Sequence, residues 1–213
     1  MFTGIIKAKG EITAMQKTGG DVRLAVRSAG LPFSSFEVGE SIAVNGVCLT
    51  AVTLRDDGFE TDVSNETLEV TGLGQLAVGS IVNLEPSLSL ADRLGGHLVS
   101  GHIDCTGAVK RRAADARSIR LTIEIPTAYA RYVAKKGSVC VDGVSLTINE
   151  VSGNSFDLNI IPHTADETII GDYTVGTTVN VEVDMLARYV ERLLERGDDG
   201  MTLEFLRANG YVR

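Results

Sequence analysis

The segment from residue 95 to residue 102 brings two of the chain's three histidines together among glycines, in the order GGHLVSGH. A zinc-binding helix places two histidines four residues apart with a glutamate base between them. His97 and His102 are five residues apart and enclose no glutamate. On a strand, a spacing of five would put the two rings on opposite faces. We therefore expect no metal site here, and a histidine hydrogen-bonded in a core or turn is the simpler alternative.

Other common catalytic signatures are missing from the sequence, including a nucleophile elbow, a P-loop and a dinucleotide-binding glycine motif. The three cysteines, Cys48, Cys105 and Cys140, are odd in number and lack CxxC spacing. This pattern argues against a disulfide framework and a zinc ribbon, and it favours a reduced, cytoplasmic protein.

The strongest regularity is an internal repeat with a constant offset of 97 residues. VNGVCLT at residues 44–50 resembles VDGVSLT at residues 141–147, and matches at this offset continue through the chain without a gap. Two copies of a unit of about 100 residues indicate two small domains rather than a solenoid of short repeats.

Positions where the two copies differ in chemistry are candidates for specialised roles. They pair Ile5 with His102, Gly39 with Lys136, Cys48 with Ser145, Asp62 with Asn159, and Ser87 with Asp184. The second copy thereby gains an imidazole, an ammonium, a hydroxyl and a carboxylate. A duplicated domain can hold two similar ligands, and divergent polar groups can give each ligand its own role. Sequence drift in the first copy is the alternative.

Both copies have the pattern of β-strands. Val22, Leu24 and Val26 alternate with charged or small residues, and the second copy repeats this at Ile119, Leu121 and Ile123. Many short strands between glycine-rich turns indicate a sandwich or a closed barrel. A closed barrel is favoured, because so small a unit must hide its strand edges.

The C-terminal segment lies outside the repeat and has helical spacing. Apolar residues recur on one face from residue 185 to residue 196, and Gly197 then provides a stop signal. A shorter apolar set follows at Leu203, Phe205 and Leu206. The helix either packs on its own barrel or joins several copies of the chain; the pattern alone leaves both open.

Composition excludes several classes of protein. The chain has 213 residues, of which 44% are hydrophobic, and a net charge of −8. A nucleic-acid-binding protein would carry a basic stripe, whereas the only basic cluster here, Lys110–Arg112 with Arg117, is predicted to lie in a loop. No apolar run is long enough for a membrane-spanning helix, and residues 1–7 lack the features of a signal peptide.

Four segments resemble the family of riboflavin synthase α chains, whose domains are lumazine-binding barrels. They are MFTGI at residues 1–5, NGVCLT at 45–50, GGHLVSGHI at 95–103 and DGVSLT at 142–147. The likeness extends from residue 1 to about residue 190. The resemblance implies an all-β fold with two tandem six-stranded Greek-key barrels related by duplication, at residues 1–97 and 98–184. It also implies a C-terminal helical segment, residues 185–213, that assembles a homotrimer.

The implied activity is a transferase reaction, the final step of riboflavin biosynthesis. Two molecules of 6,7-dimethyl-8-ribityllumazine react by transfer of a four-carbon unit and yield riboflavin and 5-amino-6-(ribitylamino)uracil. The resemblance implies no metal and no redox cofactor, and active sites between the first barrel of one subunit and the second barrel of a neighbour. Lumazine synthase is considered as a further partner.

The resemblance also assigns residues to two substrate sites. One ligand is expected to contact Gly4, Ile5, Ile6, Cys48, Leu49, Thr50, Asp62, Val63, Ser64, Asn65, Glu66 and Thr67. The other is expected to contact Gly101, His102, Ile103, Lys136, Ser145, Leu146, Thr147, Asn159, Ile160, Ile161, Pro162, His163 and Thr164. For the chemistry we single out His102, Ser145, Thr147, Cys48 and Asp184, with Phe2 closing the site.

Two alternatives to an enzyme belong to other classes of protein. Non-catalytic relatives use the same barrels to hold a lumazine or a flavin as a chromophore, and bound ligand without turnover would favour that function. A purely structural barrel would leave the polar Gly-His and Ser-Leu-Thr segments unexplained, and it would show no affinity for lumazine.

Overall fold

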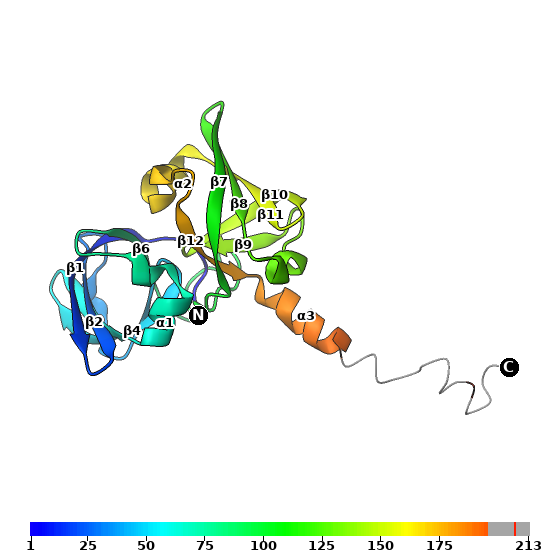
Figure 1. Cartoon of the computed structure of the whole chain (residues 1–213). Helices are drawn as coiled ribbons and strands as arrows, with labels where there is room; N and C mark the ends of the chain where they lie inside the picture. Colours follow the sequence, from blue (N-terminus) through cyan, green and yellow to red (C-terminus); the bar gives the residue numbers. More distant parts are fainter. Residues whose placement is uncertain (196–206, 208–213) are drawn as a thin grey trace.

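A computed structural model describes residues 1–195 and residue 207, and it shows two β-barrels side by side (Figure 1). The strands of the first barrel are β1 (Ala8–Thr18), β2 (Asp21–Arg27), β3 (Ser41–Val44), β4 (Val47–Arg55), β5 (Gly58–Val63) and β6 (Ile81–Pro86). Those of the second are β7 (Cys105–Asp115), β8 (Ser118–Glu124), β9 (Ser138–Val141), β10 (Val144–Ser152), β11 (Ser155–Ile160) and β12 (Thr178–Val183).

The period-2 pattern forms these strands as predicted. In β2 the side chains of Val22, Leu24 and Val26 are buried while their neighbours are half-buried or exposed. In β8 the side chains of Leu121 and Ile123 take the equivalent inward positions. A strand has its side chains on alternate faces, so one face of each strand fills the barrel and the other meets solvent or a neighbour.

The strand order confirms the predicted pair of six-stranded Greek-key barrels. In the first barrel the order is β1-β2-β5-β4-β3-β6, closed by pairing of β1 with β6, and every pairing is antiparallel. Strands β3, β4 and β5 follow one another as hairpins, and β6 returns beside β3, which is the Greek-key connection. The second barrel repeats this order with the equivalent strands.

Each barrel has its own apolar core. Phe59 in the first barrel and Phe156 in the second occupy equivalent positions and are each 1% exposed. Burial of one such large side chain contributes about 1.5–3 kcal/mol. Each barrel therefore has a packed apolar core of its own.

A local twofold axis relates the two barrels, and it passes through an antiparallel bridge between equivalent residues. Phe2 N donates to Val99 O at 2.7 Å, and Val99 N donates to Phe2 O at 3.1 Å. Both side chains are fully buried, together with Ala43 and Cys140. The two barrels are therefore arranged like the two subunits of a symmetric dimer.

A network of buried amides and one carboxylate surrounds this axis. Asn83 Nδ2 donates to Asp142 O at 2.9 Å, and its equivalent Asn180 Nδ2 donates to Asn45 O at 2.8 Å. The Oδ1 atom of Asn83 accepts from Ile169 N, and that of Asn180 accepts from Gly72 N. Each amide is thus satisfied by the other barrel, as buried polar groups require.

Short helices join the last strands of each barrel. They are α1 (Asn65–Val70) and α2 (Pro162–Glu167), followed by 3₁₀ turns at Gly72–Gln75 and Ile169–Asp172. Further 3₁₀ segments at Phe33–Ser35 and Thr127–Tyr132 lie between the second and third strands of each barrel. Thr71 and Thr168 accept hydrogen bonds from the second backbone N–H of the turns that follow them. Within the described ranges, no helix combines the length and the apolar character needed to cross a bilayer.

The predicted C-terminal helix is α3 (Met185–Glu195), which leaves the second barrel and points away from both (Figure 1). It is tied to its own barrel by polar contacts: Arg188 pairs with Asp104 at 3.1 Å, and Glu191 accepts from Arg131 and Tyr132. Its apolar side chains are 54–70% exposed, and they are Leu186, Tyr189, Val190, Leu193 and Leu194. The helix stop at Gly197 and the apolar set at residues 203–206 lie outside the described residues.

The basic cluster differs from the prediction. Lys110–Arg112 lies within strand β7 rather than in a loop, beside a register shift between Val109 and Arg111. Lys110 pairs with Glu124 at 3.2 Å on the neighbouring strand. Three consecutive basic residues break the apolar alternation, and the bulge lets the strand continue past them.

The two copies differ in a buried charge at Asp142, which stands where the first barrel has Asn45. Its carboxylate accepts from Asn180 N at 2.8 Å and from the Tyr173 hydroxyl, and it is buried. Burial raises the pKa of Asp142 to about 7, although these two hydrogen bonds lower it in part. The native state therefore keeps a proton that the unfolded chain, with an aspartate pKa of about 3.9, releases at lower pH.

We expect Asp142→Asn to remove a pH dependence of stability. Because the folded pKa is raised, the wild-type contribution is fully present below about pH 4 and is lost as pH rises through 7. Between pH 5 and 8 the wild type should lose about 2–3 kcal/mol of unfolding free energy relative to the variant. Urea titrations of both proteins at several pH values measure this difference, and parallel curves would contradict it.

Candidate functional site

Two equivalent polar patches lie on the outer faces of the barrels, where two strands meet beside a short helix. The first patch consists of Cys48 and Thr50 on β4, Asp62 on β5 and Ser64 directly after β5. The second patch consists of the equivalent residues Ser145, Thr147, Asn159 and Ile161. All eight side chains are half-buried or exposed, so each patch is open to a ligand.

Three of the predicted substrate contacts point away from these patches. Leu49, Val63 and Ile160 alternate with the patch residues, and their side chains are buried in the barrel cores. Leu146 is half-buried and packs against the second core. At these positions only backbone groups are available to a ligand.

The structure brings the predicted residues together in a different grouping. Gly4 was assigned to the site of Cys48, and Gly101 to the site of Ser145. Instead, Ser145 N donates to Gly4 O at 2.8 Å, and Cys48 N donates to Gly101 O at 2.9 Å. Residues 4–6 therefore border the second patch and residues 101–103 the first. Each of these two segments thus reaches across the local twofold axis to the other barrel, and we call them the crossing segments.

Both crossing segments depend on glycine at the point of contact. Gly4 has φ +76° and Gly101 has φ +83°, in the left-handed region that L side chains rarely adopt. A Cβ atom on Gly4 would lie 2.6 Å from Ser145 Cβ, and one on Gly101 would lie 2.6 Å from Cys48 Cβ. A side chain at either position would push the crossing segment away from the patch.

Two buried glutamates hold the crossing segments in place. Glu85 accepts from Thr3 N and Thr3 Oγ1, both at 2.7 Å, and from Gly4 N at 3.0 Å. Glu182 accepts in the same way from Ser100 and Gly101. Burial raises the pKa of both carboxyls, and these hydrogen bonds act against the rise. The sequence analysis did not select them, although the match of Glu85 with Glu182 was visible in the repeat.

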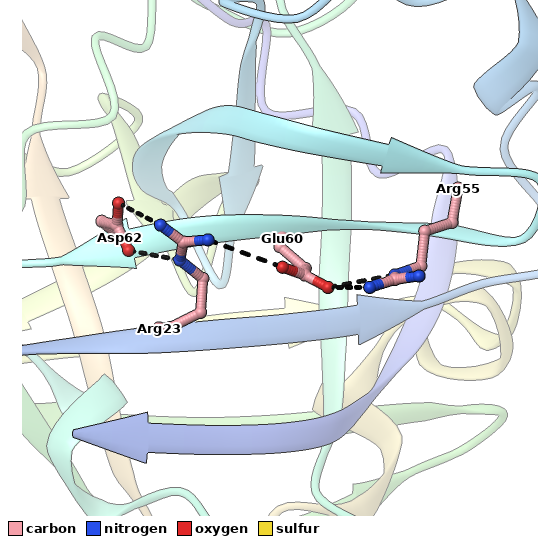
Figure 2. Close-up of polar contacts among 4 residues, drawn as sticks. All are labelled: Arg23, Arg55, Glu60 and Asp62. Carbon is pink, nitrogen blue, oxygen red and sulfur yellow. Dashed lines mark hydrogen bonds and ion pairs between the residues drawn. The ribbon is translucent and has the colours of Figure 1, made fainter. Parts of the chain in front are cut away.

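Asp62 belongs to a row of ion pairs in the first barrel (Figure 2). Figure 2 shows the Arg23 side chain between Asp62 and Glu60, with Arg55 on the far side of Glu60. Arg23 donates to both Asp62 oxygens, at 2.5 and 2.8 Å, which holds the pKa of that carboxyl below its usual range. Asp62 can therefore accept hydrogen bonds but not donate them.

The equivalent face of the second barrel lacks this row. Asn159 replaces Asp62, and the equivalent of Arg23, Arg120, pairs with Asp115 at 2.7 Å instead. An amide both donates and accepts, so the two patches present different hydrogen-bonding groups at the same position. The sequence difference between Asp62 and Asn159 thus corresponds to a difference in hydrogen bonding in the structure.

Lys136 is exposed and has φ +68°, at the turn where the first barrel has Gly39 with φ +99°. Both residues donate the same backbone hydrogen bond, from Lys136 N to Ile148 O and from Gly39 N to Ala51 O, each at 2.8 Å. A lysine in the left-handed region costs about 1–2 kcal/mol relative to glycine. Strain of this kind is found at functional positions, where the side chain rather than the backbone is needed.

The other predicted catalytic residues lie in different environments. His102 is exposed, beside the first patch on the crossing segment. Asp184 is half-buried and caps α3, where its Oδ1 atom accepts from Leu186 N at 3.0 Å. Phe2 is fully buried and packs with Cys48 between the barrels, so it supports the first patch from beneath.

Ser145 has a partner that the sequence analysis did not include among the site residues. His97 Nδ1 lies 2.7 Å from Ser145 Oγ, and the ring is half-buried. Among the described residues, the equivalent Cys48 has no side-chain hydrogen bond. The signal that could have found His97 is its place in the GGH segment, which comes directly before the second copy.

The remaining predicted contacts belong to the short helices that border the patches. Ser64 caps α1, where its Oγ accepts from Thr67 N at 3.2 Å, and Asn65 and Glu66 begin that helix. In α2, Pro162 occupies the first turn, followed by His163 and Thr164. Each patch is therefore bordered by a strand end, a helix start and a segment from the other barrel.

A family model described as the lumazine-binding domain matches the chain twice, at residues 3–87 and at residues 100–184. The two matches have the offset of the internal repeat. Together they cover more than half of the chain, and each contains the six strands of one barrel.

Curated relatives match over nearly the whole chain. Riboflavin synthase of Photobacterium phosphoreum is 44% identical, with all of both chains covered. Riboflavin synthase of Mycobacterium tuberculosis H37Rv is 45% identical over 91% of this chain and 98% of the relative. Riboflavin synthase of Bacillus subtilis is 37% identical over 99% of this chain and 100% of the relative.

Solved structures with the same fold include LumP complexed with 6,7-dimethyl-8-(1'-D-ribityl) lumazine and LumP complexed with riboflavin. The first has a TM-score of 0.77 at 26% identity, and the second has a TM-score of 0.79 at 27% identity. Each comparison covers 86% of this chain and 99% of the other.

We expect Gly96→Ala to destabilise the protein more than Gly95→Ala does. A Cβ atom on Gly96 would lie 2.2 Å from Thr3 O and 2.7 Å from Ser145 Cβ, whereas one on Gly95 would meet only the flexible Ile5 side chain at 3.3 Å. The expected loss of unfolding free energy is about 1–3 kcal/mol for Gly96→Ala and about 0.5 kcal/mol or less for Gly95→Ala. Denaturant titration of both variants measures this, and equal losses would show that the segment can shift freely.

Proposed function

The chain belongs to the riboflavin synthase family, and we propose that its two patches hold the two identical substrates of one dismutation. The reaction transfers a four-carbon unit between two molecules of 6,7-dimethyl-8-ribityllumazine and yields riboflavin and 5-amino-6-(ribitylamino)uracil. It is the final step of riboflavin biosynthesis and a transferase reaction. One observation supports different roles for the two substrates: the two patches are equivalent in position but have different polar groups.

The proposed substrate contacts follow the crossing of the segments. One lumazine contacts the first patch, the start of α1 and residues 101–103. The other contacts the second patch, the start of α2, Lys136 and residues 4–6. Backbone groups of these segments pair with the pyrimidinedione edge of the ring, and the hydroxyl, amide and carboxylate side chains pair with the ribityl chain.

The chemistry requires positioning and modest acid–base assistance. The conjugated ring acidifies the C7 methyl group of one lumazine, and a nucleophile must add to the other. Holding two rings face to face contributes about 7–11 kcal/mol through proximity alone. Proton transfer by placed groups adds a factor of about 10²–10⁴. Hydroxyls, an imidazole and a thiol meet this need without a metal or a redox cofactor.

We assign the chemistry to His102, Ser145, Cys48 and Asp184, at which the copies diverge, and to Thr147, whose equivalent Thr50 is the same residue. His102 borders the first patch and Ser145 and Thr147 belong to the second, so the two lumazines meet unlike groups. Cys48 lies in the first patch, and Asp184 places a negative charge at the end of the second barrel. Identical substrates can thereby act as donor and acceptor.

We also propose that the working unit is a homotrimer whose sites lie between the first barrel of one subunit and the second barrel of another. The apolar face of α3 supports this, because no described part of the chain covers it and a second copy offers an equally apolar face. The three functional units are then residues 1–97, 98–184 and 185–213. We propose a cytoplasmic location and lumazine synthase as an associated protein, with no role for nucleic acid or membrane.

Turnover of a single substrate tests the function. Purified protein mixed with 6,7-dimethyl-8-ribityllumazine, without metal or nucleotide and with a chelator present, should release one riboflavin for every two lumazines consumed. Absorbance of riboflavin and chromatographic measurement of lumazine give this ratio.

Tight binding of lumazine without product would instead indicate a ligand-carrying barrel protein, in which the patch residues serve as contacts only. A requirement for an added metal or nucleotide would contradict the cofactor-free reaction. Absence of lumazine binding would leave the barrels without the proposed function.

Substituting the exposed face of α3 tests the assembly. The triple variant Leu186→Ser, Tyr189→Ser, Leu193→Ser should sediment as a monomer and lose most of its activity, because each site needs two subunits. The polar contacts of α3 with its own barrel are untouched in this variant. Light scattering and sedimentation measure the mass.

The matched control is the triple variant Val38→Ser, Val78→Ser, Val175→Ser, which removes apolar side chains that are 61–66% exposed elsewhere on the barrels. It should keep the wild-type mass and activity. A helix variant that remains trimeric would remove α3 from the interface.

A further inference from the structure

The hydroxyl of Ser145 and the imidazole of His97 form a pair at the edge of the second patch. Their polar atoms, Oγ and Nδ1, are 2.7 Å apart. The pair is held from two sides: Ser145 N donates to Gly4 O at 2.8 Å, and His97 N donates to Thr3 O at 3.2 Å. Gly96 packs against the same serine, since its Cβ position lies 2.8 Å from Ser145 Oγ. The geometry of the pair is therefore set by backbone contacts on both residues.

In one of the two neutral forms of the ring, this hydrogen bond runs from the serine hydroxyl to the imidazole and can carry the serine proton. For Nδ1 to accept from the hydroxyl, the ring must be neutral and must carry its hydrogen on Nε2. Burial lowers the pKa of His97, which favours this neutral form, and the charge of Asp184 acts against the fall. The Nε2 atom is buried and has no hydrogen-bond partner among the described residues. An unpaired buried polar atom costs about 1–3 kcal/mol, and a group kept at such a cost calls for a functional reason.

The Asp184 carboxylate can stabilise the protonated ring of His97. Asp184 lies at the end of β12, and its carboxylate is oriented by the hydrogen bond from Leu186 N at 3.0 Å. The hydrogen-bonded neighbours of His97, which are Thr3 and Ser145, carry no charge, and the buried Glu85 carboxyl lies beyond Thr3, from which it accepts two hydrogen bonds. Asp184 is thus the described charged group that acts on this imidazole.

We propose that His97 is a positioning residue that acts through Ser145, by orienting its hydroxyl and taking its proton when the oxygen adds to the bound lumazine. This inference rests on the proposed function of the second patch. In the step, a bond forms between Ser145 Oγ and C7 of the lumazine, and the π electron pair of the attacked double bond moves into the conjugated ring. The hydroxyl proton passes to His97 Nδ1, and the return of that proton releases the serine when the oxygen leaves.

The decisive variant is His97→Asn, whose side-chain amide can occupy the place of Nδ1 and hydrogen-bond to Ser145 but cannot take a proton. We expect kcat to fall about 100-fold, within the range for loss of a proton acceptor, with KM changed by less than about threefold. Wild-type kcat should rise with pH through a value below 6.5, where His97 becomes neutral, and this acidic limb should be missing in His97→Asn. Lumazine binding, followed by its fluorescence, and thermal unfolding show whether the variant is folded and loaded.

A double-mutant cycle separates action through Ser145 from a merely structural role. In a Ser145→Ala background, His97→Asn should lower kcat by less than about threefold, since the group on which it acts is gone. Equal losses in both backgrounds would overturn the proposal, as would a wild-type kcat or an unchanged acidic limb in His97→Asn. Should His97→Asn fail to fold, His97→Gln in the same cycle decides the matter, because its amide is uncharged and keeps the length of the ring. Wild-type protein that binds lumazine without turnover would instead refute the proposed function, before any variant is compared.

Discussion

The structure depends on a polar seam in which each barrel satisfies buried groups of the other. Asn83 and Asn180 donate to backbone oxygens across the seam and accept from backbone nitrogens across it. Left unpaired, each such group would cost about 1–3 kcal/mol, so the two barrels have one orientation in which all four bonds form. Apolar contacts alone would tolerate small rotations of one barrel against the other. The hydrogen bonds of the amides do not tolerate such rotations, and they therefore also fix the positions of the patch residues.

The same seam explains how alike folds can present unlike chemistry. The framework residues Glu85 and Glu182 perform the same task in both halves, as do Gly4 and Gly101. Several differences between the copies fall on side chains on which this framework does not depend, such as Cys48 and Ser145. In the proposed function, the symmetry of the backbone would place the two lumazines in matching poses, while the side chains would make their surroundings different. A reaction in which one molecule gives and its twin receives needs both properties.

Much of the fold could be predicted from the sequence, because alternation of apolar residues and a constant offset both report directly on local structure. The crossing of residues 4–6 and 101–103 could not, since an offset is the same whether a segment stays on its own barrel or exchanges. Lys110–Arg112 was placed wrongly because a bulge, which hides the strand pattern, follows from tertiary pairing with β8. His97 was passed over among the site residues because comparison of the copies can only expose residues that have an equivalent, and this one precedes the second copy. Glu85 and Glu182 showed in the repeat, but a repeat does not reveal which backbone groups a carboxylate accepts from.

The bridge between Phe2 and Val99 has a consequence for the origin of the chain. Contacts that pair a residue with its own equivalent, as this bridge does, are those of an isologous interface between identical subunits. A gene for a single barrel would have encoded a homodimer with two equal patches and with segments exchanged between its subunits. Fusion of two such genes would turn that interface into an intrachain seam and would free each half to mutate alone. Asp142 and Tyr173 occupy the positions that Asn45 and Leu76 have in the first copy. In a homodimer, each of these substitutions would have appeared in both subunits, on both sides of the axis.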